Sequence, residues 1–172
     1  MKRIILVTGG QRSGKSEYAE RLALSLSPRP LYIATARVRD EEMRLRVERH
    51  RQRRAGRWDT LEEPLRLSRC KVERRVALVD CLTLWAANWL PEDGSLPDVE
   101  LTLGKLKAEL DGFLGQEATF IFVGNETGLG GISPNALQRT FTDLVGLLNQ
   151  HVARLSDEVW LVVAGIPIKI KG

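Results

Sequence analysis

An eight-residue segment near the N-terminus has the residue types and the spacing that hold a nucleotide. Residues 9–16 read GGQRSGKS and fit the pattern G-x-x-x-x-G-K-[ST] at every fixed position. In such a loop, backbone N–H groups surround the phosphates, and the following helix adds the positive end of its dipole. Lys15 is expected to neutralise charge on the β- and γ-phosphates, and the Ser16 hydroxyl is expected to bind Mg²⁺. A glycine-rich turn that fits by chance is the alternative, but the apolar run before the segment and the helical pattern after it favour the nucleotide site.

Asp80 is the candidate for the acidic partner that such a loop needs. It follows the apolar run 76–79, so its carboxylate is expected at the end of a buried strand. A carboxylate there lies beside the nucleotide loop, within reach of Mg²⁺ directly or through water. A residue that caps the next helix is the alternative, and we favour the metal role because the loop needs an acid. Glu126, after the apolar run 119–123, competes for the same role.

Positive charge is concentrated in residues 37–57, which contain nine arginines. Three interpretations are open. The arginines can form a solvated helix face, partly paired with nearby Asp and Glu residues. They can bind nucleic acid, although the stretch lacks the interleaved aromatic residues that stack on bases. Some of them can instead bind the phosphates of a nucleotide held by residues 9–16.

His50 lies inside this arginine-rich stretch and is one of only two histidines. Neighbouring guanidinium groups disfavour the charged imidazolium, so a neutral ring nitrogen is available to attack phosphorus. A nucleophilic imidazole beside a nucleotide can accept a nucleotidyl group. From the residues alone, a histidine without a catalytic role is the more frequent case in a charged stretch. His151 falls within the amphipathic pattern of residues 135–155 and is interpreted as structural.

A glycine-rich segment follows the fourth apolar run. Residues 124–131 read GNETGLGG, and four glycines in eight residues indicate a chain that is mobile or closely approached by another group. A loop that contacts a second substrate and a plain long turn are equally consistent with this composition.

Helical and strand patterns alternate along the chain, which predicts an α/β domain with a mostly parallel central sheet flanked by helices. The expected strands are continuous apolar runs, as in strands buried on both faces: residues 3–8, 31–36, 76–79, 119–123 and 159–164. The expected helices carry apolar residues at helical spacing: residues 13–26, 40–54, 82–90, 99–114 and 135–155. Ser133 and Pro134 occupy the expected N-cap and first helical position of the last helix. Residues 56–75 and 91–97 are expected to be surface connections.

The composition is that of a globular protein, and we interpret residues 1–172 as a single nucleotide-binding domain. Hydrophobic residues make up 43% and charged residues 28%, which excludes wholesale disorder. No apolar run approaches the roughly 20 residues of a membrane helix, so no integral membrane segment is expected. The apolar run at the N-terminus is too short for a signal peptide, so we expect a cytoplasmic protein. Cys70 and Cys81 have no metal-ligand spacing, and no disulfide is expected between them.

The net charge of +4 hides a difference between the two halves of the chain. Residues 1–75 carry 20 Lys and Arg residues against 10 Asp and Glu, whereas residues 76–172 carry 6 against 12. A basic half of this kind needs a polyanion, which is either nucleic acid or the phosphates of a nucleotide.

Taken together, the residues resemble the bifunctional adenosylcobinamide kinase/adenosylcobinamide-phosphate guanylyltransferase family of cobalamin biosynthesis. The resemblance extends over essentially the whole chain. It rests on TGGQRSGKS, LYIATA, VDCLT, NETGLGG and the closing DEVWLVVAGIPIKIKG, and on two spaced blocks. The first block is His50-Arg51 with Arg54, Trp58, Thr60 and Glu62, and the second is Phe141 with Asp143, Gly146, Asn149 and Gln150.

The resemblance implies two reactions. The family first phosphorylates the aminopropanol hydroxyl of adenosylcobinamide, using ATP or GTP. It then transfers GMP from GTP to that phosphate through a covalent GMP–histidine, and pyrophosphate is released. The position that matches this histidine is His50, and Lys15 is the other residue expected to act in catalysis.

The resemblance also implies a RecA-like P-loop fold and a homotrimer, and it accounts for the basic half of the chain without nucleic acid. Mg²⁺ is expected at Ser16 and Asp80. The nucleotide contacts that the resemblance implies fall on Gly9, Gly10, Gln11, Arg12, Ser13, Gly14, Lys15, Ser16, Ala34, Thr35, Ala36, Arg51, Gln52, Arg53, Arg54, Glu62 and Asp80.

Two other functions are open on the sequence. A P-loop kinase of small molecules without a covalent intermediate would never retain label from the α-phosphate of GTP. An ATPase stimulated by nucleic acid would bind DNA or RNA through the arginine-rich stretch, with an affinity that falls steeply with salt. This second alternative leaves His50 and residues 124–131 without a role.

Overall fold

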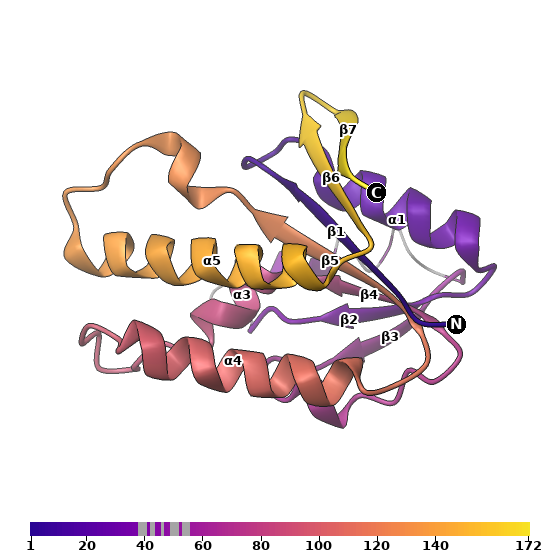
Figure 1. Cartoon of the computed structure of the whole chain (residues 1–172), viewed down its shortest axis with the longest axis horizontal. Helices are drawn as coiled ribbons and strands as arrows, with labels where there is room; N and C mark the ends of the chain where they lie inside the picture. The colour runs from indigo at the N-terminus through magenta and orange to yellow at the C-terminus, as the bar shows by residue number, and fades with distance from the viewer. Residues whose placement is uncertain (38–40, 42–43, 46, 49–51, 53–55) are drawn as a thin grey trace.

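The computed structural model describes residues 1–37, 41, 44–45, 47–48, 52 and 56–172. Its strands are β1 (Arg3–Gly9), β2 (Leu31–Ala34), β3 (Asp59–Glu62), β4 (Val76–Asp80), β5 (Thr119–Asn125), β6 (Glu158–Val163) and β7 (Ile166–Lys171). These seven strands form one sheet in the order β3-β2-β4-β5-β1-β6-β7 (Figure 1). The first six run parallel to one another, and β7 runs antiparallel beside β6.

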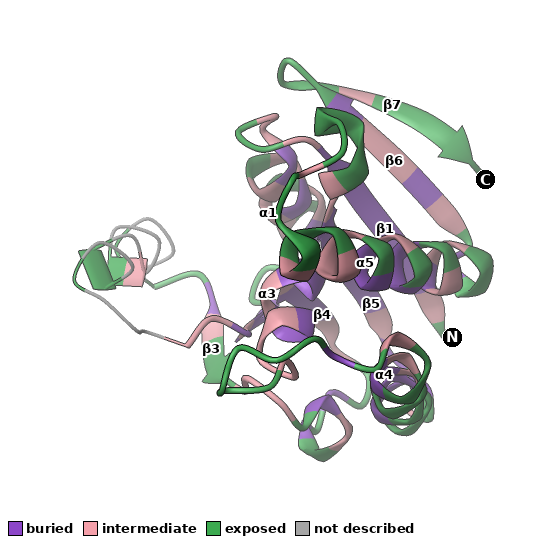
Figure 2. Cartoon of the chain, turned by 90° about the vertical axis from the view of Figure 1, so that its left-hand side faces the viewer, coloured by how far each residue is buried: buried purple, intermediate pink, exposed green. Residues whose placement is uncertain are grey.

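Helices cover both faces of this sheet. The α-helices with continuous bounds are α1 (Lys15–Leu26), α3 (Leu82–Ala87), α4 (Val99–Leu114) and α5 (Ala136–Leu155), and the 3-10 helices are η1 (Leu67–Arg69) and η2 (Thr127–Gly130). The helices α3, α4 and α5 pack on one face, and α1 packs on the other (Figures 1 and 2). The predicted α/β fold, with a mostly parallel sheet flanked by helices, is confirmed.

Two hydrophobic clusters fill the space between the sheet and its helices. In β1, Ile4 and Leu6 belong to the cluster under α3, α4 and α5, whereas Ile5 and Val7 belong to the cluster under α1. All four side chains are buried, and full burial of such a side chain stabilises the fold by roughly 1.5–3 kcal/mol. A strand that is buried on both faces is apolar at every position, which is why the run in the sequence shows no alternation.

Two strands lie where the sequence does not predict them. A surface connection is predicted over residues 56–75, but β3 and η1 lie within it. β3 is at one edge of the sheet and three of its four side chains are exposed, so no apolar run marks it. β7 is at the other edge, where Pro167 is tolerated and most side chains are exposed.

Several predicted boundaries are wrong by a few residues. The predicted strand 31–36 ends at Ala34, and the predicted helix 82–90 ends at Ala87. The last helix begins at Ala136, and its N-cap is Asn135, whose Oδ1 accepts a hydrogen bond from the Gln138 N–H at 3.0 Å. The prediction for Ser133 and Pro134 is therefore wrong, because the side chain of Asn135 reaches the first-turn N–H instead.

Other expectations concern burial and the second predicted helix. Cys70 and Cys81 are both buried and free of a disulfide. The described residues between 41 and 52 are helical, and the rest of the predicted helix 40–54 lies outside the described residues. Within the described part of the chain, no helix has the length and apolar character needed to span a bilayer.

Candidate nucleotide site

The loop between β1 and α1 has the backbone of a phosphate-binding loop. Gly9 ends β1, and a Cβ at this position would lie 2.5 Å from the Val162 carbonyl oxygen of β6. Gly14 adopts a φ of 92°, which glycine tolerates best, immediately before α1 begins at Lys15. Both positions therefore require glycine, one for lack of space and the other for its backbone angle.

The Lys15 side chain turns back over this loop. It is only 8% exposed, and its Nζ donates a hydrogen bond to the Gly10 carbonyl oxygen at 3.0 Å. A backbone hydrogen bond also fixes the loop at Ser13. The Ser13 carbonyl oxygen accepts from the N–H of Gly165, in the turn between β6 and β7, at 2.8 Å. The ammonium group is thus held at the mouth of the loop, where a bound phosphate would lie.

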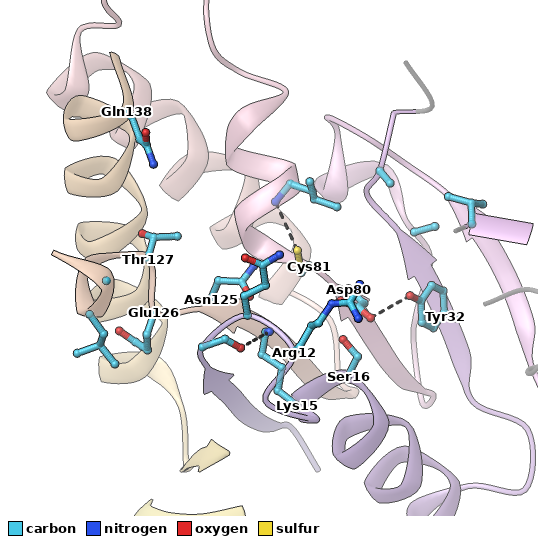
Figure 3. Close-up of a pocket in the computed structure, with 18 residues that line it drawn as sticks. Arg12, Lys15, Ser16, Tyr32, Asp80, Cys81, Asn125, Glu126, Thr127 and Gln138 are labelled. Atoms are coloured by element: carbon cyan, nitrogen blue, oxygen red, sulfur yellow. Dashed lines mark hydrogen bonds between the residues drawn. The ribbon is translucent and has the colours of Figure 1, made fainter. Parts of the chain in front are cut away.

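A cavity of about 670 Å³ opens above this loop (Figure 3). Its walls come from the carboxyl ends of β2, β4 and β5 and from α3, α5 and η2. The residues that line it are Gly10, Gln11, Arg12, Lys15, Ser16, Tyr32, Ala34, Ala36, Val47, Asp80, Cys81, Leu84, Asn125, Glu126, Thr127, Leu129, Gly130 and Gln138. Ligands bind at this edge of parallel α/β sheets.

Asp80 ends β4 and lines the cavity together with Ser16. Its Oδ2 accepts a hydrogen bond from the Tyr32 hydroxyl at 3.0 Å. The alternative role as a helix cap is not observed, because the N-cap of α3 is Cys81, whose Sγ accepts from the Leu84 N–H. A hydroxyl and a carboxylate at the edge of a phosphate site form a donor set that suits Mg²⁺, which takes one or two carboxylates and completes its shell with phosphate oxygens and water.

Glu126 follows β5 directly and also lines the cavity. In the sheet, β5 lies between β1, which leads into the nucleotide loop, and β4, which ends at Asp80. Figure 3 shows Glu126 and Asp80 on opposite sides of Lys15. The two acids therefore lie on two different walls of the same site, and the assignment of Mg²⁺ to Asp80 rather than to Glu126 stays a prediction.

The segment 34–36 is divided between the cavity and the protein interior. Ala34 and Ala36 line the cavity, whereas Thr35 is fully buried. The Thr35 hydroxyl donates to the Cys81 carbonyl oxygen at 2.8 Å and accepts from the Cys81 N–H at 2.9 Å. Thr35 thus joins the end of β2 to the end of β4 and fixes the wall that carries Asp80.

The other residues predicted to contact the nucleotide either do not line the cavity or lie outside the described residues. Gly9, Ser13 and Gly14 shape the loop without lining the cavity, and Glu62 is exposed at the end of β3, opposite Ala34. Gln52 is exposed, and its Nε2 donates to Glu48 Oε1 at 3.3 Å. His50, Arg51, Arg53 and Arg54 lie outside the described residues.

Several lining residues were not predicted from the sequence. Tyr32 and Leu84 lie within apolar runs that indicate only core positions, and Gln138 lies in the first turn of an amphipathic helix. Residues 124–131 did carry a signal in their glycines, and Asn125 to Thr127, Leu129 and Gly130 all line the cavity. Val47, in the arginine-rich stretch, lines it as well.

The thiol of Cys81 takes no part as a nucleophile at neutral pH. Burial, together with the neighbouring Asp80 carboxylate, raises the pKa of this thiol to about 12. The reactive thiolate is therefore scarce, although the residue lines the cavity.

Comparisons with known proteins cover nearly the whole chain. The model of the family described as cobinamide kinase / cobinamide phosphate guanyltransferase matches residues 5–170. The bifunctional adenosylcobalamin biosynthesis protein CobP of Pseudomonas aeruginosa is 43% identical over 171 residues, which cover 97% of this chain and 96% of that protein. The bifunctional adenosylcobalamin biosynthesis protein CobU of Escherichia coli K12 is 38% identical, with 98% and 99% covered. Its namesake in Salmonella typhimurium LT2 is 36% identical with the same coverage.

The matched region contains every described residue that lines the cavity, from Gly10 to Gln138. The relatives align over nearly their full lengths as well as over nearly all of this chain. The chain belongs to the cobinamide kinase/cobinamide phosphate guanylyltransferase family.

Proposed function

We propose that the chain phosphorylates adenosylcobinamide with ATP or GTP and then transfers GMP from GTP to the new phosphate, in cobalamin biosynthesis. The observation that carries the proposal is the cavity above the phosphate-binding loop, which lies within a full-length family match. The cavity has basic groups at the loop and a carboxylate on each of two walls, so it combines the charges that phosphoryl transfer needs.

In the kinase step, the loop 9–16 and Lys15 hold the phosphates of the nucleotide. The substrate hydroxyl attacks the γ-phosphorus, and the nucleoside diphosphate leaves. Lys15 offsets the negative charge that spreads over the transferred group, and positioning supplies most of the rate.

Mg²⁺ is the metal that we propose for this site, held by Ser16 and Asp80. When bound, it neutralises negative charge on the phosphate oxygens. The Tyr32 hydroxyl orients the Asp80 carboxylate through its hydrogen bond, and Thr35 fixes the backbone beside it. Mg²⁺ binding in the absence of nucleotide is expected to be weak, because two side chains supply few ligands.

In the guanylyl step, we propose that His50 attacks the α-phosphorus of GTP and that pyrophosphate leaves. The resulting P–N bond joins GMP to the imidazole and is labile enough to pass GMP to the substrate phosphate. Arg51, Gln52, Arg53 and Arg54 are the neighbouring nucleotide contacts that the family resemblance implies. Guanidinium groups suit this role because they donate paired hydrogen bonds to phosphate oxygens.

The glycine-rich loop after β5 is proposed to contact the second substrate. Leu129 lines the cavity and is 77% exposed, and Ile132 nearby is 90% exposed. Exposed apolar side chains at the rim of a polar site suit a large ligand with apolar edges. The apolar surface of a corrinoid ring meets that description.

The experiment that tests the proposal follows the α-phosphate of GTP. The protein is incubated with Mg²⁺ and GTP labelled at the α-phosphorus, then denatured and examined for covalently bound label. We expect label that is stable to alkali and lost in acid, as for a phosphorus–nitrogen bond to histidine.

The His50→Asn variant is expected to retain no label while it keeps much of the kinase activity, because the kinase step needs no imidazole nucleophile. His151→Asn is the matched control, because His151 lies on α5 away from the lining of the cavity. Loss of both activities in His50→Asn would indicate a structural role for this residue. Absence of label in a parent protein that binds nucleotide would leave only a kinase or an ATPase.

We further propose that the chain assembles as a homotrimer, works in the cytoplasm and takes no nucleic-acid partner. The family resemblance supports the trimer, and the nucleotide phosphates account for the basic half of the chain. Light scattering coupled to size exclusion measures the assembled mass, and a monomer in that measurement would contradict the trimer.

A further inference from the structure

Glu126 is the second carboxylate on the described walls of the cavity, and the metal site does not use it. It comes directly after β5, the strand that separates β1 from β4. Gly9 pairs with Asn125 and Asp80 pairs with Val123 in the sheet register, so Glu126 extends beyond both neighbours into the cavity. It lies on the opposite side of Lys15 from Asp80 (Figure 3).

The position of Glu126 is fixed from two directions. Its side-chain Oε1 accepts a hydrogen bond from the Thr8 hydroxyl at 2.6 Å, and Thr8 is buried in β1. Its backbone N–H donates to the Gly9 carbonyl oxygen at 3.1 Å. A carboxylate has about four acceptor positions, so the bond to Thr8 leaves capacity for a hydroxyl of the substrate.

Asn125, the residue before Glu126, is also fixed by two hydrogen bonds. The Asn125 N–H donates to the Thr83 hydroxyl oxygen at 3.1 Å, and the Asn125 carbonyl oxygen accepts from Asn149 Nδ2 at 2.9 Å. The sheet, α3 and α5 therefore all hold this short segment. The exposed rim at Leu129 begins three residues later, so the fixed acid lies next to the loop that is proposed to hold the second substrate.

The two reactions differ in what they need from such an acid. A hydroxyl that attacks phosphorus must lose its proton, whereas an imidazole and a substrate phosphate attack without losing one. Among the described residues that line the cavity, Asp80 is held by Tyr32 beside Ser16, and Lys15 and Arg12 are cationic. Because Asp80 is assigned to Mg²⁺ in the proposed function, Glu126 is the carboxylate that remains, within the described lining, to take a proton.

We infer that Glu126 is the general base of the kinase step, with Thr8 as its positioning residue; this rests on the proposed function. The substrate oxygen forms its bond to the γ-phosphorus as its O–H proton passes to the Glu126 carboxylate. The bond between the γ-phosphorus and the bridging oxygen breaks, and the nucleoside diphosphate leaves with the electron pair. The proton on Glu126 then passes to solvent, and the carboxylate is restored.

The test compares two activities of the full chain in Glu126→Gln. The amide keeps an acceptor oxygen for Thr8 but cannot accept a proton in this step. We expect the kcat for phosphorylation of adenosylcobinamide by γ-labelled ATP to fall about 100-fold or more, with little change in the KM for ATP. We expect the covalent label from α-labelled GTP to form at a rate close to that of the parent.

Two further variants sharpen the test. Glu126→Asp keeps a carboxylate and is expected to recover part of the kinase kcat. Thr8→Val keeps Glu126 but removes the hydroxyl that holds it, so it is expected to lower the kinase kcat less than Glu126→Gln does. Glu100→Gln, an exposed residue in the first turn of α4, is the matched control.

Two results would overturn the inference. Full kinase activity in Glu126→Gln would mean that the residue only anchors the loop. Equal losses of kinase activity and of GTP-derived label would assign it to the nucleotide or the metal that both reactions share. A parent protein without kinase activity would instead contradict the proposed function, so the two failures are distinguishable.

Discussion

Individual side chains in the site differ in how far their type alone specifies their role. Lys15 stands at the one position of the G-x-x-x-x-G-K-[ST] pattern where a cation is required, and it lies buried against the Gly10 carbonyl oxygen. The type of Asp80 alone is consistent with a helix cap or a metal ligand; Cys81 occupies the N-cap of α3, and the metal role stays a prediction. A sequence pattern gives the residue type at the end of a strand, but the cap depends on where the helix begins.

Lys15→Ala is expected to lower both the kinase step and the formation of protein-bound GMP, by about 100-fold or more, because both act on phosphates in the same loop. Initial rates of the two reactions at saturating nucleotide measure this. Lys105→Ala, an exposed lysine on α4, is the control for the change of charge. A variant that lost one reaction and kept the other would show that the two steps use different phosphate positions.

At the scale of elements, the sequence predicts well what is buried and poorly what lies at an edge. The runs that became β1, β4 and β5 are apolar because both of their faces are covered. β3 reads DTLE and β7 reads IPIKIK, and their exposed side chains follow no such run, since they pair at the margins of the sheet.

The order of the strands in the sheet could not be predicted from the sequence either. Nothing in the residues of β5 predicts that this strand lies between β1 and β4, yet that position places Glu126 on a wall of the cavity. The glycines of residues 124–131 leave a substrate loop and a plain turn equally open, and they do not indicate that Glu126 bonds to the Thr8 hydroxyl, more than a hundred residues away. Contacts of that range arise only from the tertiary fold.

The Glu109 carboxylate links α4 to the segment around η1, and its contribution to stability depends on pH. Glu109 accepts hydrogen bonds from the Ser68 hydroxyl at 2.7 Å and from Arg66 Nη1 at 3.0 Å. Burial alone would raise the pKa of Glu109, but these bonds lower it below the usual 4.5. Because the folded-state pKa is depressed, the stabilisation is present above pH 4.5 and is lost as the pH falls through the lower value.

Glu109→Gln is therefore expected to lose about 1–3 kcal/mol of unfolding free energy near neutral pH, and a loss that shrinks as the pH is lowered from 4.5 through the depressed pKa of Glu109. Urea unfolding near neutral pH and at a pH below 4.5 measures the difference. Glu100→Gln, exposed on the same helix, is expected to change little at either pH. A loss that is the same at both pH values would mean that charge on Glu109 does not contribute.

Over the whole molecule, the basic half of the chain contains the nucleotide loop, while the acidic half supplies much of the opposite wall of the cavity. A phosphorylated ligand in the cavity therefore contacts residues from both halves of the chain. The ligand joins the loop after β1 to groups that follow β4 and β5, so it stabilises the sheet as one unit.

GTP at about 100 times its dissociation constant is expected to stabilise the fold by about 2.7 kcal/mol, which raises the Tm by about 5 to 10 °C for a chain of this size. Thermal unfolding followed by circular dichroism measures the shift. Guanosine at the same concentration is the control, because it lacks the phosphates, and a shift as large as that of GTP would show that the base carries the binding. In Lys15→Ala the shift from GTP should shrink.

The hydrogen bond from the Gly165 N–H to the Ser13 carbonyl oxygen has a consequence for folding of the nascent chain. A ribosome makes residues 9–16 more than a hundred residues before it makes β5 and β6, which flank β1. At about 5–20 residues per second, residues 9–16 precede these neighbouring strands by roughly 5 to 30 seconds. Half-made chains should therefore be unable to capture nucleotide, and proteolysis of stalled nascent chains should cleave residues 9–16 freely until β6 has cleared the exit tunnel.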